Sequence, residues 1–300
     1  MKNLKLSTIL LGTQLLISNL ALSTVINADC ISNPNDPYDL GYVMDVGENK
    51  GECMATHARP VMQTEESLSR PIYKNSVQLA NVSHKGEFYT AEIPMHGIED
   101  VIFQVETFEA PVPAAHTQIR LKFLENSPVT LINQDPTSEN SEFVTHNLIF
   151  SVEAIGEEGY EYDIFKGLGK NMKTVYRVKT LEGFVERVVV GKGSQVKQWK
   201  MKLDKSEKRK LLMNYTFYSA KKGFSDIYNT VKLNCTIELL RIVDQSTRNS
   251  FRKSFGKLIT LDLYPAVVKP ALISRGLVSA NGSSDLEDLA NDPTIAHMLD

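Results

Sequence analysis

The sequence lacks the motifs that mark several large functional classes. It contains no glycine-rich phosphate-binding loop and no Cys-x-x-Cys pair, which argues against nucleotide binding, zinc binding and dithiol redox chemistry. It also lacks a basic excess: 33 Lys and Arg stand against 36 Asp and Glu, a formal charge of −3. Nucleic-acid-binding proteins need a basic surface, so this class is disfavoured. We therefore expect no cofactor, no metal and no nucleic-acid partner.

No segment beyond residue 22 is apolar enough to span a bilayer. At the N-terminus, Lys2 and Lys5 precede the mostly apolar run Ile9–Leu22, the pattern of a secretory signal peptide. Cleavage is expected after Ala28, or earlier after Ser23. Removal of residues 1–28, which hold two lysines and no acidic residue, takes the formal charge from −3 to −5.

Two other interpretations of the N-terminus remain open. The apolar run could be retained as a membrane anchor, although it is short and interrupted by polar residues. A lipoprotein attached at Cys30 is disfavoured because Asp29 stands where lipoprotein signals have a small residue. The sequence favours a periplasmic or secreted protein with no stable membrane span in the mature chain.

Cysteine is scarce, and its distribution is informative. The chain has only Cys30, Cys53 and Cys235. In an exported protein, Cys30 and Cys53 form the natural disulfide, which leaves Cys235 as the odd thiol.

The rest of the sequence predicts an α+β protein in three parts. Residues 29–100 are rich in turn formers and short strand-like runs, so we expect a small β-rich N-terminal region. Residues 101–250 form the main domain, with strands followed by two helices. Residues 251–300 lose regular pattern, which predicts an extended C-terminal segment and a flexible acidic tail.

Local signals within residues 101–250 place the elements. Ile119, Leu121 and Phe123 alternate with polar residues, the period of a half-buried strand, and His116 stands at its head. Asp204 followed by Glu207 is a capping box that starts a helix running to about Ala220.

Cys235 lies where a second helix is expected to begin. Asn234 is a favoured N-cap, and Ile237–Val243 continues as a helix-like stretch. A thiol in the first helical turn feels the positive end of the helix dipole, which stabilises the thiolate. His116 is a suitable base for such a nucleophile. The distance between the two residues in the sequence is no obstacle, because catalytic pairs of this kind meet in the folded structure. A buried structural cysteine and a structural histidine are the alternatives.

Three segments carry a resemblance to a known family. They are Ala115–Arg120 (AHTQIR), Phe165–Leu168 (FKGL) and Tyr228–Thr236, which ends in Asn234-Cys235-Thr236. With the helix at Leu203–Leu212, they make the stretch 101–244 resemble the Lnb N-terminal periplasmic domain family. The resemblance implies a permuted papain-like (NlpC-like) core with an antiparallel sheet, in which the His strand precedes the Cys helix. It also implies acyl transfer to lipoprotein N-termini, with Cys235 as nucleophile and His116 as base.

The chain departs from the family pattern at two loops. Lys170-Asn171-Met172 replaces an expected Gly-Gly-Tyr-type loop, and residues 190–196 match the family poorly. The acyltransferase members also carry membrane helices after this domain, and this chain has none. These departures affect the expected substrate contacts more than the pair Cys235 and His116.

The remaining site residues are predicted with less support from the pattern. The group that would orient His116 is open among Glu153, His146 and Asn147, which lie in the strand-like segment 143–154. Glu153 falls near where the family places a polar residue after an apolar strand, so it is the residue we assign to this role, with a salt-bridged or exposed glutamate as the alternative. Gln104 and Gln118 are candidate donors to an oxyanion, together with the Cys235 backbone N–H. Arg120, Gln118 and Asn234 are the predicted substrate-binding residues.

We therefore predict an exported cysteine-dependent enzyme that transfers or hydrolyses an acyl group through a thioacyl intermediate. A lipid or lipoprotein-linked substrate follows from the resemblance alone. A cell-wall peptide amidase or peptidase is the nearest rival. A non-catalytic envelope binding module is a second, favoured by the altered loops.

Overall fold

The computed structural model describes residues 25–69, 75–108, 115–159, 169, 171–230, 233–248 and 268–299. The predicted signal peptide, residues 1–28, lies almost entirely outside these residues. The segment Phe165–Leu168, which carries part of the family resemblance, also lies outside them.

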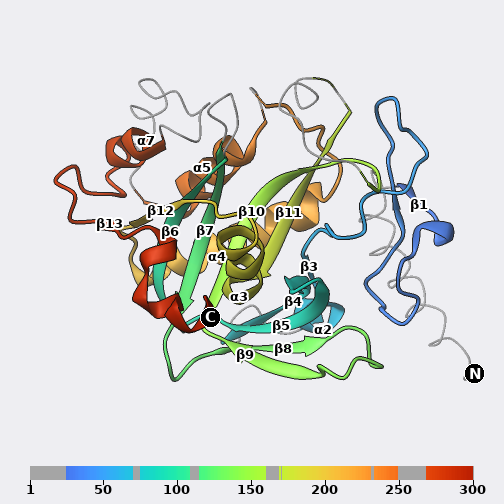
Figure 1. Cartoon of the computed structure of the whole chain (residues 1–300), viewed down its shortest axis with the longest axis horizontal. Helices are drawn as coiled ribbons and strands as arrows, with labels where there is room; N and C mark the ends of the chain where they lie inside the picture. Colours follow the sequence, from blue (N-terminus) through green and yellow to red (C-terminus); the bar gives the residue numbers. More distant parts are fainter. Residues whose placement is uncertain are drawn as a thin grey trace, which may run out of the picture.

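One mixed sheet dominates the fold (Figure 1). Its strands are β3 (Met62–Gln63), β4 (Ser76–His84), β5 (Glu87–Pro94), β6 (Ile98–Thr107), β7 (Ala115–Phe123), β8 (Val129–Asn133), β9 (Glu142–Thr145), β10 (Asn147–Ile155), β11 (Lys173–Thr180), β12 (Val196–Lys200) and β13 (Asp285–Leu286). The order is β13-β12-β6-β7-β10-β11-β4-β5-β8-β9, with β3 added to β4. All described pairs are antiparallel except β4 with β11. The predicted α+β class is confirmed, and the predicted antiparallel sheet holds apart from this one pair.

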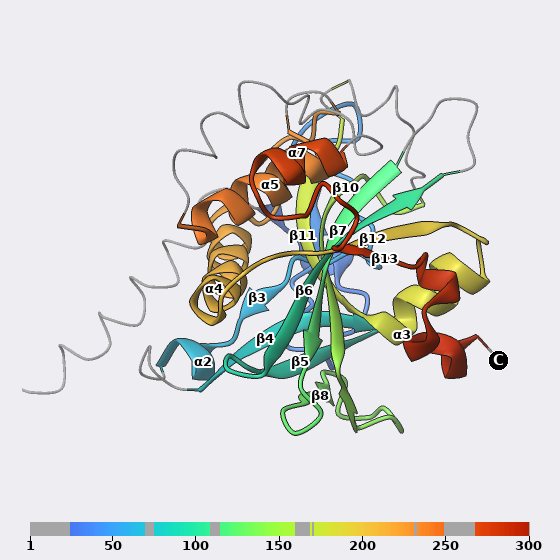
Figure 2. The ribbon, with the colours of Figure 1, turned by 90° about the vertical axis from the view of Figure 1, so that its left-hand side faces the viewer.

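Helices cover both faces of the sheet (Figure 2). One face carries α4 (Lys205–Lys222), α5 (Cys235–Ser246) and α7 (Val268–Ser274), whose apolar residues join the main core. The opposite face carries α3 (Leu181–Phe184), the π-helix η3 (Val185–Val190) and two C-terminal 3-10 helices, η5 (Leu289–Asn291) and η6 (Pro293–Met298). A short helix, α2 (Glu65–Ser69), precedes β4.

The predicted starts of α4, at Asp204, and of α5, at Asn234, are both confirmed. Asp204 accepts a hydrogen bond from the Glu207 backbone N–H at 2.8 Å, and the Glu207 carboxylate accepts one from the Asp204 N–H at 3.0 Å. This capping box satisfies two backbone donors that the first turn of α4 leaves free. The helix ends at Lys222, two residues beyond the expected end, with Gly223 as its C-cap.

Strand β7 is buried on both faces, unlike the half-buried strand that its alternation predicts. Ile119 and Leu121 pack into the core shared with α5. Gln118 and Arg120 point to the opposite side, and they are also fully buried, because η5 and η6 cover that face. A polar side chain is tolerated there because each one finds a hydrogen-bonding partner.

The C-terminal residues are packed against the sheet, which corrects the prediction of a flexible tail. Leu289 and Ile295 have no exposed surface and join a core with Ile149. Asp292, between them, makes an ion pair with Arg120 at 3.0 Å. The acidic composition suggested disorder, but two well-placed apolar residues and one ion pair are enough to dock this short segment on a preformed face.

The N-terminal region is smaller than predicted. It contains β1 (Val25–Ile26), the 3-10 helix η1 (Ala28–Cys30) and β2 (Tyr42–Val43). Strands β4 and β5 belong instead to the main sheet, and the expected boundary at residue 100 falls inside β6. Sequence patterns do not reveal which strands pair, so β4 and β5 looked like part of a separate region.

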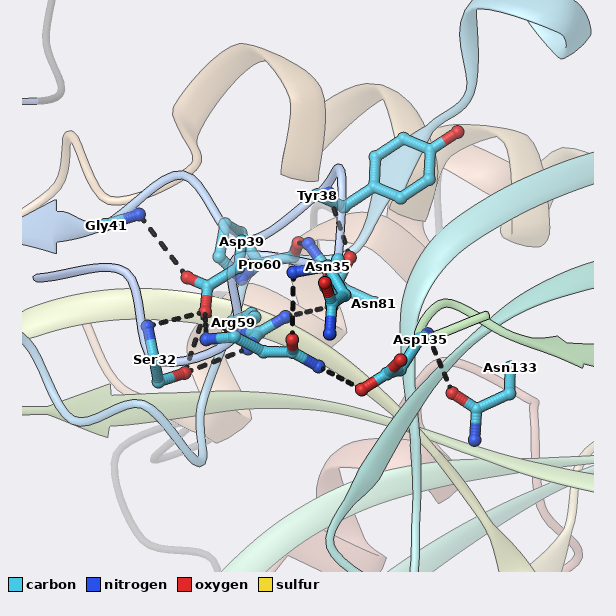
Figure 3. Close-up of polar contacts among 12 residues, drawn as sticks. Ser32, Asn35, Tyr38, Asp39, Gly41, Arg59, Pro60, Asn81, Asn133 and Asp135 are labelled. Carbon is cyan, nitrogen blue, oxygen red and sulfur yellow. Dashed lines mark hydrogen bonds and ion pairs between the residues drawn. The ribbon is translucent and has the colours of Figure 1, made fainter. Parts of the chain in front are cut away.

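The disulfide Cys30–Cys53 is confirmed, with the Cα atoms 5.3 Å apart. Beside it, the buried Arg59 guanidinium pairs with Asp36 and with Asp39, the latter at 2.9 Å, and donates to the Ser32 hydroxyl at 3.2 Å (Figure 3). A hydrogen bond from Asn33 to Asp135, at 2.8 Å, links this cluster to the loop after β8. The N-terminal region is thereby fixed to the main sheet.

Candidate active site

Local hydrogen bonds place Cys235 at the first position of α5. The Asn234 side chain accepts from the Ile237 backbone N–H at 2.9 Å, and its amide donates to the Thr230 carbonyl at 2.7 Å. The predicted N-cap is therefore confirmed. The Cys235 side chain is buried, and its sulfur lies 3.9 Å from the Thr236 hydroxyl. It is the free cysteine of the chain.

Three neighbouring strands bring His116 between two carboxylates. His116 lies on β7 directly opposite Glu106 of β6. On the other side, Gln118 pairs with Ser151 of β10, which puts Glu153 two residues further along, level with His116. The His116 Nε2 atom is 4.0 Å from the Glu153 Oε1 atom. This distance allows electrostatic attraction but is too long for a direct hydrogen bond.

Cys235 and His116 line the same cavity, close enough for each to alter the ionisation of the other. Burial disfavours the Cys235 thiolate, but the charge of the His116 imidazolium, helped by the neighbouring Thr117, outweighs this effect and lowers the thiol pKa to about 7. Burial also disfavours the His116 imidazolium, yet Cys235, Glu153 and Glu106 together raise the imidazole pKa. The geometry therefore favours a thiolate–imidazolium pair near neutral pH.

Glu153 is held by cations from β11. Arg177 Nη1 donates to Glu153 Oε2 at 2.8 Å, Lys179 pairs with Oε1, and the Ser151 hydroxyl donates to Oε1 at 2.7 Å. Burial opposes ionisation of Glu153, but Arg177, Lys179 and His116 hold its pKa well below the usual range. Burial and the neighbouring arginines lower the pKa of Lys179 to about 7, despite its contact with Glu153. Glu153 is thus a fixed anion beside His116.

These side chains line a cavity of about 260 Å³. Its wall consists of His57, Glu106, Phe108, Ala115, His116, Val152, Glu153, Ala154, Ile155, Gly156, Met172, Arg177, Lys179, Arg187, Lys192, Tyr228 and Cys235. Cys235, His116 and Glu153 therefore open on one space that a small molecule could enter.

The N-terminal region builds part of this wall. The His57 carbonyl accepts a hydrogen bond from Arg177 Nη2 at 2.6 Å, so it helps to fix the arginine that holds Glu153. Two further bonds join the region to the loop after β10: Ala55 N–H to the Gly156 carbonyl at 3.1 Å, and Glu158 N–H to the Cys53 carbonyl at 2.9 Å. The disulfide-bonded segment is therefore continuous with the site.

The structure brings Cys235, His116 and Glu153 together, but it leaves the predicted substrate-binding residues outside the cavity wall. Asn234 acts as the helix cap. Gln118 donates to Gln104 at 3.0 Å, and Gln104 donates to Gln198 at 2.7 Å, so neither amide points to Cys235 as an oxyanion donor would.

Arg120, also predicted to bind substrate, is 1% exposed. It pairs with Asp292 and donates to the Asn147 side chain at 2.8 Å. These contacts give it a structural role on the face that η5 and η6 cover.

Sequence reasoning missed the cations of the cavity. Arg177 and Lys179 alternate with Tyr176 and Val178 in a strand that is otherwise suitable for a core. Two buried positive charges in one strand need a partner, and this could have pointed to a nearby carboxylate. No comparable signal in the sequence pointed to His57, which reaches the cavity only through the docking of the N-terminal region.

Two features are absent from the part of the chain that the structure describes. It contains no group of three or more His, Cys, Asp or Glu side chains placed to hold a metal ion. It also contains no helix with the length and apolarity needed to cross a membrane.

Comparison with known proteins identifies one family. Neither the curated proteins nor the solved structures give a match to this chain. The model of the Lnb N-terminal periplasmic domain matches residues 85–269, more than half of the sequence. The matched span contains His116, Glu153 and Cys235, and the description of the family indicates a periplasmic location. The chain therefore belongs to the Lnb N-terminal periplasmic domain family.

Proposed function

We propose that this protein is a cysteine-dependent enzyme that transfers or hydrolyses an acyl group. Cys235 is the nucleophile, His116 is the general base and acid, and Glu153 positions His116 and stabilises its imidazolium form. The observation that supports this most strongly is the meeting of Cys235, at the start of α5, with His116 of β7 in one cavity, where Glu153 Oε1 lies 4.0 Å from His116 Nε2. A nucleophile, a base and an orienting group in this order are the usual parts of a thiol acyl-transfer site.

The chemistry follows from these positions. The Cys235 thiolate attacks the carbonyl carbon of an ester or amide and forms a C–S bond. The tetrahedral intermediate collapses when the bond to the leaving oxygen or nitrogen breaks, and the His116 imidazolium protonates that atom. Water or an amine then attacks the thioester, His116 takes its proton, and the thiolate is released.

The helix start offers stabilisation of the oxyanion. The first backbone N–H groups of a helix have no partner within the helix, and its N-terminus carries partial positive charge. The Cys235 N–H is therefore the donor that we assign to the oxyanion. The side chains of Gln104 and Gln118 are not assigned this role, because they donate to other glutamines.

The permuted papain-like arrangement is part of the proposal. The His strand β7 precedes the Cys helix α5 in the chain, and α5 packs against β7 and β10. A lipid ester or a lipoprotein-linked substrate is the class that family membership favours. A cell-wall peptide amide remains the rival substrate, and a binding module without catalysis remains the rival function.

Trapping of the thioacyl intermediate tests the proposal. The purified protein is incubated with p-nitrophenyl butyrate, and peptide mass spectrometry locates any added butyryl group. We expect one group on Cys235, its loss in Cys235→Ser, and slower formation in His116→Gln. Parallel assays with a peptide amide separate the two substrate classes. Butyrylation of scattered lysines alone, with Cys235 unmodified, would support the binding module instead.

A further inference from the structure

The cavity around Cys235 carries more positive than negative charge. Four cationic side chains line it, from Arg177, Lys179, Arg187 and Lys192, against the carboxylates of Glu106 and Glu153. Cys235 and His116 do not change this balance, because a thiolate and an imidazolium cancel. Because its pKa of about 7 leaves Lys179 only partly protonated at neutral pH, the wall has a surplus of between one and two positive charges.

The four cations differ in whether they have a carboxylate partner. Arg177 and Lys179 share the single carboxylate of Glu153. Arg187 and Lys192 are exposed, and neither has an ion pair or a hydrogen bond to another residue that the structure describes. Arg187 is nevertheless close enough to contribute to the lowered pKa of both Glu153 and Lys179. Its charge therefore acts on the interior of the cavity.

The two unpaired cations stand on a rigid support. Arg187 belongs to η3, a π-helix, a rare form that often occurs at functional sites. On either side of Arg187, Val185 and Val188 are buried against the sheet. Lys192 follows in a turn in which the Gly193 N–H donates to the Val189 carbonyl at 3.1 Å. Such a support holds the charges at the mouth of the cavity without a carboxylate to neutralise them.

An anionic ligand would relieve this arrangement. Neighbouring cations repel one another, and an anion bound between them is attracted to each of them. This attraction is stronger where water is partly excluded. A phosphate matches better than a carboxylate, because its charge and its oxygens can serve several cations at once. The guanidinium of Arg187 presents a fork of N–H donors that fits phosphate oxygens, and the Lys192 ammonium adds a compact charge.

We infer that the substrate of this site is an acyl ester that also carries a phosphate group, with the scissile carbonyl at Cys235 and the phosphate at Arg187 and Lys192. Lys179 lies deeper in the same wall and adds attraction. This inference rests on the proposed function, since it assigns the substrate class of the same site. The same cations could bind the phosphate of a phosphoglycerol-type ester or free phosphate, and binding of glycerol 3-phosphate and of inorganic phosphate separates these two ligands.

Two alkylating reagents that differ only in charge test the cationic cavity directly. Iodoacetate is anionic and iodoacetamide is neutral, and both react with the Cys235 thiolate. We expect the ratio of the iodoacetate rate to the iodoacetamide rate to exceed the ratio for glutathione by about tenfold, the low end of what a charged cleft produces. The excess should fall steeply between low and high salt.

A matched pair of variants locates the effect. In Arg187→Gln/Lys192→Gln, the rate ratio should fall to near that of glutathione. Using the ratio cancels any change in thiolate population, because this affects both reagents equally. The control is Lys205→Gln/Lys210→Gln, which removes the same charge from exposed positions of α4, away from the cavity. It should keep the wild-type ratio.

Calorimetry with glycerol 3-phosphate, inorganic phosphate and glycerol, at equal ionic strength, completes the test. We expect glycerol 3-phosphate to bind more tightly than phosphate, glycerol not to bind, and the Arg187/Lys192 variant to lose binding. Equal binding of both phosphates would assign the site to free phosphate and overturn the ester class. If Cys235 reacts rapidly but shows no preference for iodoacetate, and no phosphate binds, the inference fails while the proposed function stands. If phosphate binds but the thiol is inert, the anion site stands and the proposed chemistry fails.

Discussion

Replacement of Glu153 by Gln removes the anion at the centre of the site while keeping its shape. Arg177 and Lys179 lose their shared carboxylate, and His116 loses the negative charge 4.0 Å from Nε2. An opposite charge at such a distance changes a pKa by about 1–3. Cys235 contributes more than Glu153 to the raised pKa of His116, so we take the lower end of that range.

The expected loss of reactivity follows from this value. The Cys235 pKa of about 7 means that half of the thiol is ionised at pH 7. If the weaker imidazolium makes ionisation about tenfold less favourable, roughly a tenth remains ionised, and labelling by iodoacetamide slows about fivefold. Leaving a buried cation unpaired also costs about 3 kcal/mol of unfolding free energy, near the low end for broken buried pairs because Lys179 can lose its proton.

Glu106→Gln is the matched control. Glu106 faces His116 from β6, but it has a smaller effect on the imidazole pKa than Glu153. We expect its labelling rate at pH 7 to stay within about twofold of wild type and its stability within about 1 kcal/mol. Rates are measured under pseudo-first-order conditions, and stability by urea denaturation. Equal effects of the two variants, or wild-type labelling in Glu153→Gln, would refute the role assigned to Glu153.

Three further predictions concern the support of the site. Cys30→Ser/Cys53→Ser should lose about 3 kcal/mol in urea denaturation, because the disulfide closes a loop with a sequence separation of 23; an unchanged midpoint would show that the segment is held without it. The pKa of Lys179 is about 7 in the folded protein and about 10.4 in the unfolded chain, so the unfolded state binds more protons between these pH values. The free energy of unfolding should therefore increase, through this residue, as the pH rises from 7 to 10. Lys179→Met should lose that increase in urea denaturation, and an identical pH profile would contradict the assignment. Ile295→Ala should cost about 2–4 kcal/mol while leaving the labelling rate of Cys235 unchanged, and a loss below about 0.5 kcal/mol would show that η6 is not part of the core.

The parts of the fold that local chemistry determines could be predicted from the sequence. The capping box of Asp204 and Glu207 and the N-cap Asn234 act within one turn, so their residue types alone locate the helix starts. The disulfide followed from cysteine scarcity in a chain expected to be exported. The resemblance to the family implied that Cys235 and His116 lie together, as they do in the structure. Their positions in the sequence did not by themselves predict this.

The parts that depend on contacts between distant segments could not be predicted. The parallel pairing of β4 with β11 joins residues almost a hundred positions apart, and no local pattern encodes it. Arg120 was predicted to bind substrate, and its structural role was missed because its partner Asp292 lies in a segment whose composition suggested disorder. The cationic wall was missed because Arg177, Lys179 and Arg187 come together only when β11 and η3 pack around the cavity.

The pH dependence of iodoacetamide labelling at Cys235, in the disulfide-intact protein and in His116→Ala, tests the central claim most directly. We predict fast labelling in the wild-type protein with an apparent pKa of about 7, as the imidazolium stabilises the thiolate. In His116→Ala, the apparent pKa of Cys235 should rise to that of an ordinary thiol or above, because burial still disfavours the thiolate and no imidazolium stabilises it. Slow labelling that is the same in both proteins would contradict the account and identify Cys235 as a structural thiol.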